Sequence, residues 1–241
     1  VERPEGSTFI SRGSLKGAIE FRDVAFSYPN QTVPSLRGIN LRIKPGEKVA
    51  ILGRTGSGKT TLEKLILGLY QPSSGAVLVD GIDLRQLDPA ELRRQIGYVQ
   101  QDVMLFYGSL RDNLTMGAPL ADDAAVVKAA EIAGLLGLVN AHPQGFDMVV
   151  GERGESLSGG QRQALSLLMA TFTQPQILLL DEHTAALDPQ RAELVTQLTQ
   201  SIVAQHQLTT LMVTHNMEQA LRLGNRLIMM DAGQVVVDVS G

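Results

Sequence analysis

The segment GRTGSGKT, residues 53–60, constrains the fold of this 241-residue chain more than any other stretch. It fits the pattern G-x-x-x-x-G-K-[ST] of a phosphate-binding loop. The run KVAILG, which ends at the first glycine of the segment, is typical of a strand covered on both faces. Apolar residues then recur at helical spacing, at Leu62, Leu65, Ile66 and Leu69. A strand before and a helix after are the context that the pattern needs, so an accidental glycine-rich turn is the weaker interpretation.

The residues of this loop suit a chain of phosphates. Glycines let the backbone wrap a phosphate so that successive N–H groups point inward, and the helix that begins near Lys59 adds its positive dipole end. Lys59 offers a point charge to the β and γ phosphates, and the Thr60 hydroxyl suits Mg²⁺. We therefore expect the loop to bind a nucleotide through Gly53, Thr55, Gly56, Ser57, Gly58, Lys59, Thr60 and Thr61.

Two further predicted strands end in polar residues. ILLL runs into Asp181 and Glu182, and TLMVT runs into His215. Ligands of open α/β sheets bind beyond the carboxyl ends of the strands. We expect Asp181 to hold Mg²⁺ through water, Glu182 to act as base or orienting group for the attacking water, and His215 to contact the γ-phosphate.

Each of these residues also has a structural interpretation. Asp181 and Glu182 alone would be read as a helix-capping pair, and His215 as a surface or capping residue. The phosphate loop favours the metal-and-water interpretation, because phosphoryl transfer needs a metal ligand and a water-orienting group. Tyr28, at the end of the first predicted strand, could stack on a base; otherwise it is a core or edge tyrosine. The spacing of histidines and carboxylates does not indicate zinc.

The alternation of strands and helices predicts an α/β fold with a mainly parallel sheet. Residues 1–18, rich in Gly, Ser and Pro, are predicted to be a linker, and residues from about 100 to 170 a helical insertion. Net charge is −4, which argues against a nucleic-acid partner. The chain has no cysteine, which excludes disulfides and thiolate chemistry. No apolar run reaches the roughly 18 residues of a membrane span.

The segment LSGGQ, residues 157–161, follows the phosphate loop by about a hundred residues and precedes the Asp181–Glu182 pair by about twenty. In this order the motifs resemble those of the ATP-binding cassette (ABC) ATPases, and the resemblance covers the chain from about residue 19. It implies a P-loop NTPase with a RecA-like, mainly parallel sheet, an antiparallel β subdomain and a helical insertion subdomain. Residues 19–241 would form the nucleotide-binding domain.

The resemblance also assigns roles to individual residues. Tyr28 matches the aromatic that stacks on adenine, and Gln101 matches the glutamine that senses Mg²⁺ and the membrane partner, with Gln100 as the alternative register. Asp188 matches the loop that communicates across the dimer, and His215 the switch histidine. The signature that closes on the γ-phosphate of the opposite subunit corresponds to Ser158, Gly159, Gly160 and Gln161.

The function implied is that of an ATP hydrolase. In this family two cassettes form a head-to-tail dimer around two ATP molecules, with Mg²⁺ as cofactor. The chain would then work with a second nucleotide-binding domain and with a transmembrane transporter domain. We expect it in the cytoplasm, held at the inner face of the membrane by that partner. The sequence does not identify the transported substrate.

The resemblance divides near residue 160. Up to that point, segments such as VVGERGESLSGGQ resemble exporter and protein-secretion cassettes. Beyond it, Met169, His183 and Ala185 are similar to bacterial importer ATPases. We interpret His183 as a marker of origin whose side chain points away from the phosphates. One alternative is therefore an engineered or recombined chimera that folds and binds nucleotide with little turnover. Another is a soluble ABC ATPase acting on nucleic acid or ribosomes.

Overall fold

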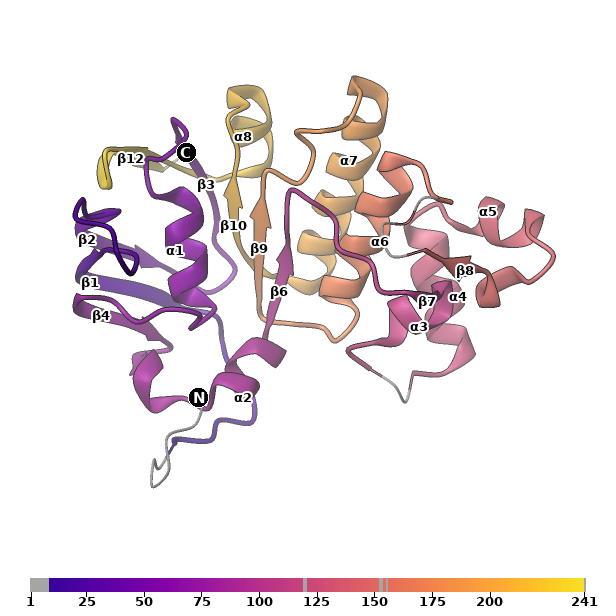
Figure 1. Ribbon diagram of the computed structural model, residues 1–241, viewed down its shortest axis with the longest axis horizontal. Helices are drawn as coiled ribbons and strands as arrows, with labels where there is room; N and C mark the ends of the chain where they lie inside the picture. Colours follow the sequence, from indigo (N-terminus) through magenta and orange to yellow (C-terminus); the bar gives the residue numbers. More distant parts are fainter. Residues whose placement is uncertain (1–8, 119–120, 152–153, 155, 241) are drawn as a thin grey trace. The chain divides into compact units, whose positions relative to one another are not determined.

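A computed structural model describes residues 9–118, 121–151, 154 and 156–240 of the chain (Figure 1). The chain divides into two compact units. Unit 1 runs up to Gly97 and also takes residues 176–181 and the chain from residue 207 onward. Unit 2 takes residues 98–175 and 182–206. The chain therefore leaves unit 1 and returns to it twice, and Asp181 and Glu182 fall on either side of one crossing.

Unit 1 contains an antiparallel sheet whose strands lie in the order β2-β1-β4-β5. The strands are β1 (Ile19–Phe26), β2 (Leu36–Ile43), β4 (Ser74–Val79) and β5 (Ile82–Asp83). Ile39, Leu41 and Ile43 of β2 are buried and the residues between them are exposed, as the period-2 pattern predicts for a sheet with one covered face. Asp80 and Gly81, with φ of +50° and +80°, form the tight turn between β4 and β5 that the Asp-Gly pair predicts.

The larger sheet has the strand order β12-β11-β3-β10-β9-β6. Its strands are β3 (Lys48–Gly53), β6 (Ile96–Val99), β9 (Ile177–Asp181), β10 (Thr209–Val213), β11 (Arg226–Asp231) and β12 (Gln234–Ser240). Strands β11, β3, β10 and β9 run parallel, and β12 pairs with β11 in the antiparallel sense. Every residue of β10 is buried, as expected of a strand covered on both faces. The predicted α/β fold with a mainly parallel sheet is confirmed.

The register of the parallel strands brings their ends to one level. Val213 pairs with Ile51 on one side and with Asp181 on the other. The chain therefore leaves β3, β9 and β10 at the same edge of the sheet, as the prediction of neighbouring strands requires. The phosphate loop and Asp181 lie at this edge.

Four short helices belong to unit 1: α1 (Lys59–Ile66), the 3-10 helix η1 (Leu84–Gln86), α2 (Pro89–Arg94) and α8 (Met217–Leu223). Helix α2 has the predicted start, because Asp88 accepts a hydrogen bond from Ala90 N and Pro89 occupies the first helical position. Helix α1 ends earlier than the apolar spacing predicts. Gly68 has φ +65° and turns the chain, which leaves the Leu69 side chain 50% exposed.

The part of the predicted linker that the structure describes lies along unit 1. Ile10 N donates to Gln86 O, and Leu15 is buried. The backbone N–H groups of Lys16 and Ala18 donate to the Asp80 carboxylate at 2.6 and 2.9 Å. The glycine- and serine-rich composition of residues 1–18 gives no sign of this contact, because it depends on Asp80, which is distant in sequence. Residues 1–8 are outside the described part of the chain.

Unit 2 is mostly helical. It contains the two-stranded sheet β7 (Gly108–Ser109) and β8 (Val149–Val150) and the helices α3 (Leu110–Thr115), α4 (Asp123–Ile132), α5 (Leu136–Ala141), η2 (Gly145–Asp147), α6 (Gly159–Thr171) and α7 (Pro189–His206). Helices α6 and α7 pack against each other (Figure 1). In the described part of the chain, no helix combines the length and apolarity needed to cross a membrane.

Candidate functional site

The phosphate loop leaves the start of helix α1 open. Gly56 and Gly58 have φ of +80° and +102°, in the left-handed region that favours glycine. A Cβ atom on Gly58 would come within 2.7 Å of Leu36 Cδ2 and Ser35 O. Gly58 is the N-cap of α1 and, having no side chain, makes no cap hydrogen bond to the first helical N–H groups. These N–H groups and the positive end of the helix dipole form a site suited to an anion.

Two polar side chains of the loop point to the same conclusion. Ser57 Oγ is buried and has no hydrogen-bond partner among the residues that the structure describes. The Lys59 side chain is only 6% exposed, and its ammonium donates to Gly53 O at 2.8 Å and to Arg54 O at 3.0 Å. Buried hydroxyl groups in proteins are almost always hydrogen-bonded, so an orphaned one beside a buried cation fits an anionic ligand such as a phosphate.

Thr60 joins the phosphate loop to the end of β9. Its hydroxyl donates to Asp181, with 3.1 Å to Oδ2 and 3.4 Å to Oδ1. Hydroxyl and carboxylate oxygens are ligands that Mg²⁺ accepts, together with water and substrate phosphates. No group of three or more His, Cys, Asp or Glu side chains suited to a metal occurs among the described residues. A site made of one acid, one hydroxyl and phosphate oxygens does not need such a group.

Glu182 follows Asp181 with an unusual backbone. Its φ is +46°, uncommon for a residue other than glycine, and the turn is closed by the bond from Ala185 N to Glu182 O. Conformations of this kind cost about 1–3 kcal/mol and gather at functional sites. The sequence gives no sign of this strain.

His215 lies just after β10, two residues beyond Val213, and is exposed. Buried Thr214 anchors the segment, because its hydroxyl donates to Gln219 Oε1 at 3.0 Å. Asn216 accepts from Gln219 N and caps helix α8. The segment that carries His215 is thus fixed on both sides.

Tyr28 belongs to a cluster of aromatic rings. Its ring meets Phe26 and Tyr70 edge to face, with centroids 4.9 and 5.2 Å away. The hydroxyl is 3.1 Å from Thr61 Oγ1, and Lys64 Nζ lies 5.5 Å from the ring centroid. The Thr61 contact attaches Tyr28 to the helix that follows the phosphate loop, where a stacked base would extend from bound phosphates.

The predicted signature segment starts helix α6 with a closed cap. Ser158 Oγ accepts from Gln161 N at 3.3 Å, and Ser158 N donates to Gln161 Oε1 at 2.8 Å. Cβ atoms on Gly159 and Gly160 would lie 3.3 Å from Leu187 Cδ2 and from Arg191 Cβ, respectively. The two glycines therefore allow α6 to approach the start of α7 closely.

Asp188 has a local role that the sequence reading missed. It accepts from Arg191 N at 3.1 Å at the start of α7, and its carboxylate lies 3.3 Å from Arg191 Nε. The position is that of a helix N-cap, where an acid favours the helix dipole. Asp at this position and Arg three residues later are a signal from which this cap could have been predicted.

His183 is buried in unit 2, 2% exposed, and its Nε2 is 3.2 Å from Thr199 Oγ1. The Thr199 hydroxyl donates to Val195 O, so the ring donates from Nε2 to Thr199 Oγ1. Burial lowers the His183 pKa from 6.5 to about 4. The side chain thus has a structural partner in helix α7.

Gln101 is exposed and comes two residues after β6. The backbone O of Gln100 accepts from Gln163 Nε2 at 3.4 Å. Within unit 1 the structure brings together the phosphate loop, Asp181 and Tyr28, with His215 at the same sheet edge. Gln101, Glu182, Ser158–Gln161 and Asp188 belong to unit 2. Sequence reasoning missed Glu63, an acid buried in helix α1.

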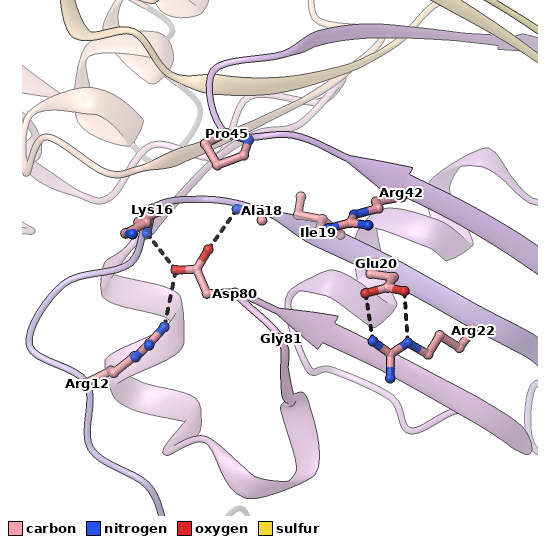
Figure 2. Close-up of a pocket in the computed structure, with 10 residues that line it drawn as sticks. All are labelled: Arg12, Lys16, Ala18, Ile19, Glu20, Arg22, Arg42, Pro45, Asp80 and Gly81. Carbon is pink, nitrogen blue, oxygen red and sulfur yellow. Dashed lines mark hydrogen bonds and ion pairs between the residues drawn. The ribbon is translucent and has the colours of Figure 1, made fainter.

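A hollow of about 390 Å³ lies on unit 1. Figure 2 shows the residues that line it. Its cationic side chains are Arg12, Lys16, Arg22 and Arg42. Its acids already have partners, because Asp80 accepts from two backbone N–H groups and Glu20 pairs with Arg22. The lining residues are all outside the set that the motifs predict, so the shape of this hollow does not locate the phosphate site.

Comparisons with known proteins agree with this geometry. A family profile described as "ABC transporter" matches residues 36–185. The chain is 40% identical over 235 residues to the "Uncharacterized ABC transporter ATP-binding protein YfiB" of Bacillus subtilis, covering 98% of the chain and 40% of that protein. It is 39% identical over 222 residues to the "Cyclolysin secretion/processing ATP-binding protein CyaB" of Bordetella pertussis, covering 92% of the chain and 31% of that protein.

A solved structure of a bacterial Atm1-family ABC exporter with ATP bound has the same fold, with a TM-score of 0.87 and 30% sequence identity. The alignment covers 98% of the chain and 40% of that exporter chain. The chain therefore spans less than half the length of these relatives.

Proposed function

Because the chain belongs to the ABC transporter family, as an ATPase domain of that family, we propose that it binds MgATP, hydrolyses it in a head-to-tail dimer and thereby powers a transmembrane partner. The observation that carries the proposal is the open phosphate loop. Uncapped N–H groups, the unpartnered Ser57 hydroxyl and the buried Lys59 ammonium all lie in one short segment. Phosphate oxygens would satisfy the donors in this segment.

Thr60 and Asp181 are the proposed protein ligands for Mg²⁺, with Gln101 as the third. Bound there, Mg²⁺ would neutralise charge on the β and γ phosphates. The Thr60–Asp181 hydrogen bond already holds the two oxygens together, so the residues need little rearrangement to accept the ion.

Glu182 is the proposed base or orienting group for the attacking water. It is one residue past Asp181, and its positive φ re-aims the chain at this point. His215 would contact the γ-phosphate, and Tyr28 would stack on the adenine. These assignments rest on the positions of the residues at the strand ends and on the family resemblance.

The second nucleotide-binding domain would be another copy of this chain. Its Ser158–Gln161 segment would close on the γ-phosphate, supported by the positive end of the α6 dipole. Asp188, which caps α7, would communicate across the interface. In this arrangement each site takes its phosphate loop from one copy and its signature from the other.

An exposed apolar surface on unit 2 is an argument for a transmembrane partner. Met104, Phe106 and Tyr107 are 71%, 51% and 75% exposed. Val149 is also exposed and pairs with Ser109 in the small sheet just after them. Asn113 fixes the loop, because its side chain accepts from Phe106 N and donates to Phe106 O. Large apolar side chains held in this way are typical of a docking site.

We propose that this surface binds the cytoplasmic face of a transmembrane domain, which would keep the chain at the inner face of the membrane. The named relatives are ATP-binding proteins of transport and secretion systems. The mosaic origin near residue 160 stays a prediction, and relatives at 38–40% identity align across that position.

ATP turnover of the 241-residue chain and of a Glu182→Gln variant tests the proposal, with dimer formation followed in MgATP. The variant should lose turnover by about 100- to 1,000-fold, because the attacking water loses its base. It should also accumulate ATP-bound dimer. Equal turnover in both proteins would contradict the role of Glu182, and absence of MgATP binding to the parent would contradict the proposed function.

A further inference from the structure

Glu63 is an acid in an environment that suits an apolar residue. It lies in helix α1 and is 0% exposed, and within the described part of the chain neither carboxylate oxygen has a hydrogen-bond partner. Leu62, Leu65 and Ile66 around it in the helix are also buried. Burial of an unpaired carboxylate is expensive, and a buried polar group without a partner calls for an explanation.

The position of Glu63 supplies one. It follows Thr60 by three residues, and residues three apart in a helix are neighbours on its surface. The Thr60 hydroxyl in turn contacts Asp181. Glu63 therefore lies one helical turn after Thr60, a residue proposed to bind Mg²⁺ together with Asp181.

The charges around Glu63 agree with this placement. Burial, and then the negative charge of Asp181, raise the pKa of Glu63 well above its usual value, while Lys64 lowers it. Two neighbouring acids repel each other when both are ionised, and a divalent cation between them relieves the repulsion. Asp181 alone offers such a cation only one negative charge.

We propose that Glu63 is a positioning residue of the magnesium site, whose carboxylate lies behind Thr60 and Asp181 and makes occupation by a divalent cation more favourable. The inference rests on the proposed function. Mg²⁺ keeps several of its water molecules in protein sites, so Glu63 can act on the ion through water or through its charge alone. Burial of the acid lowers the free energy of unfolding of the cation-free protein, and binding of the cation offsets this loss.

A purely structural role for Glu63 predicts different behaviour. If the side chain only filled space, replacing it would leave cation binding unchanged. Leucine would also pack there at no cost in buried charge, so the carboxyl would serve no purpose. The proposal instead predicts that removing the acid stabilises the empty protein and weakens cation binding.

The test uses the 241-residue chain and its Glu63→Leu and Glu63→Gln variants. Glutamine keeps the shape of the side chain, so it preserves the test should leucine disturb folding. Binding of Mn²⁺ to the ATP complex is measured by electron paramagnetic resonance, and melting temperatures are measured in EDTA. Glu131→Gln, an exposed acid in helix α4, controls for the change in net charge.

Both Glu63 variants should bind Mn²⁺ about tenfold more weakly than the parent, as expected from removing one charge near a divalent ion. Glu63→Leu should melt at a higher temperature in EDTA, and Glu131→Gln should match the parent in both measurements. Unchanged Mn²⁺ affinity in both Glu63 variants would overturn the inference and leave the proposed function intact. A parent whose ATP complex binds no Mn²⁺ would overturn both.

Discussion

Ser57 and Ser158 both lie at the start of a helix, but only the Ser158 hydroxyl has a hydrogen-bond partner among the described residues. Ser57 Oγ, in the phosphate loop, is buried without a partner. Ser158 exchanges two hydrogen bonds with Gln161 at the start of α6. A second pair of buried side chains shows the same contrast. Among the described residues Glu63 has no hydrogen-bond partner, whereas His183 pairs with Thr199.

The difference separates polar groups that await a ligand from polar groups that build the fold. An unpaired buried group costs free energy that a ligand can return on binding. A closed capping box already stabilises its helix without a ligand. The phosphate-loop region is therefore prepared for a small anion, while the region around Ser158 is prepared to be presented as a finished surface. Five substitutions, each with a stated expected result, can break or sharpen this comparison.

The largest effect is expected from Lys59→Ala. Lys59 is the buried cation of the open region, and its ammonium has only backbone carbonyls as partners. Turnover should fall by about 100- to 1,000-fold, because a charge-assisted contact to the phosphates is lost. ATP binding, measured by calorimetry, should weaken in parallel. Lys44→Ala, in an exposed turn, is the control, and an equal loss in both variants would refute the special role of Lys59.

The pH dependence of stability tests His183, a buried side chain that already has a partner in the fold. Its pKa is lowered in the folded protein from 6.5 to about 4, so folding favours the neutral ring. Its contribution to stability is complete above pH 6.5 and is lost as the pH falls toward 4, by on the order of 3 kcal/mol. The free energy of unfolding of His183→Leu should therefore fall less between pH 7 and 4.5 than that of the parent.

His206→Leu, at the end of the same helix α7, is the matched control. It should keep the acid sensitivity of the parent. If His183→Leu and the parent lose stability equally over this pH range, the buried neutral histidine is not the source.

Glycines at the two helix starts should differ when replaced by alanine. Gly58 has φ +102°, and a Cβ there would meet Ser35 O at 2.7 Å, so Gly58→Ala should destabilise by about 2 kcal/mol or more. Gly159 meets only the flexible end of Leu187, at 3.3 Å, so Gly159→Ala should change stability by less than about 1 kcal/mol. Denaturant unfolding measures both, and similar values would remove the distinction.

Ser158→Ala is expected to have a smaller effect on stability than Gly58→Ala. Loss of the cap should cost about 1 kcal/mol of unfolding free energy. MgATP binding to the monomer should stay the same, whereas ATP-dependent dimer formation should decrease. Weaker ATP binding by the monomeric variant would show that Ser158 takes part in nucleotide binding within one copy, which contradicts the comparison.

Much of the fold could be predicted because its signals are local. The phosphate loop, the turns at Asp80–Gly81 and Gly233, and the Asp88–Pro89 helix start each lie within a few residues. The strand ends could be predicted to converge because parallel strands share one polarity.

Other features depend on distant partners. Glu63 resembles a residue on the polar face of a helix, since the spacing of Leu62, Leu65 and Ile66 gives no sign that the helix is covered on more than one side. The partner of His183 is sixteen residues away, and the positive φ of Glu182 follows from packing that no local pattern encodes. Such tertiary effects explain why the convergence of the strand ends could be predicted from the sequence, whereas the state of individual side chains could not.

Amide hydrogen exchange of the chain in MgATP tests the central contrast most directly. At a protein concentration where the chain is monomeric, residues 54–61 should gain protection, because bound phosphates satisfy the open N–H groups. Residues 159–161 should exchange as they do without nucleotide, since their cap is already closed. Protection of residues 159–161 in the monomer, or no change at residues 54–61, would contradict the account.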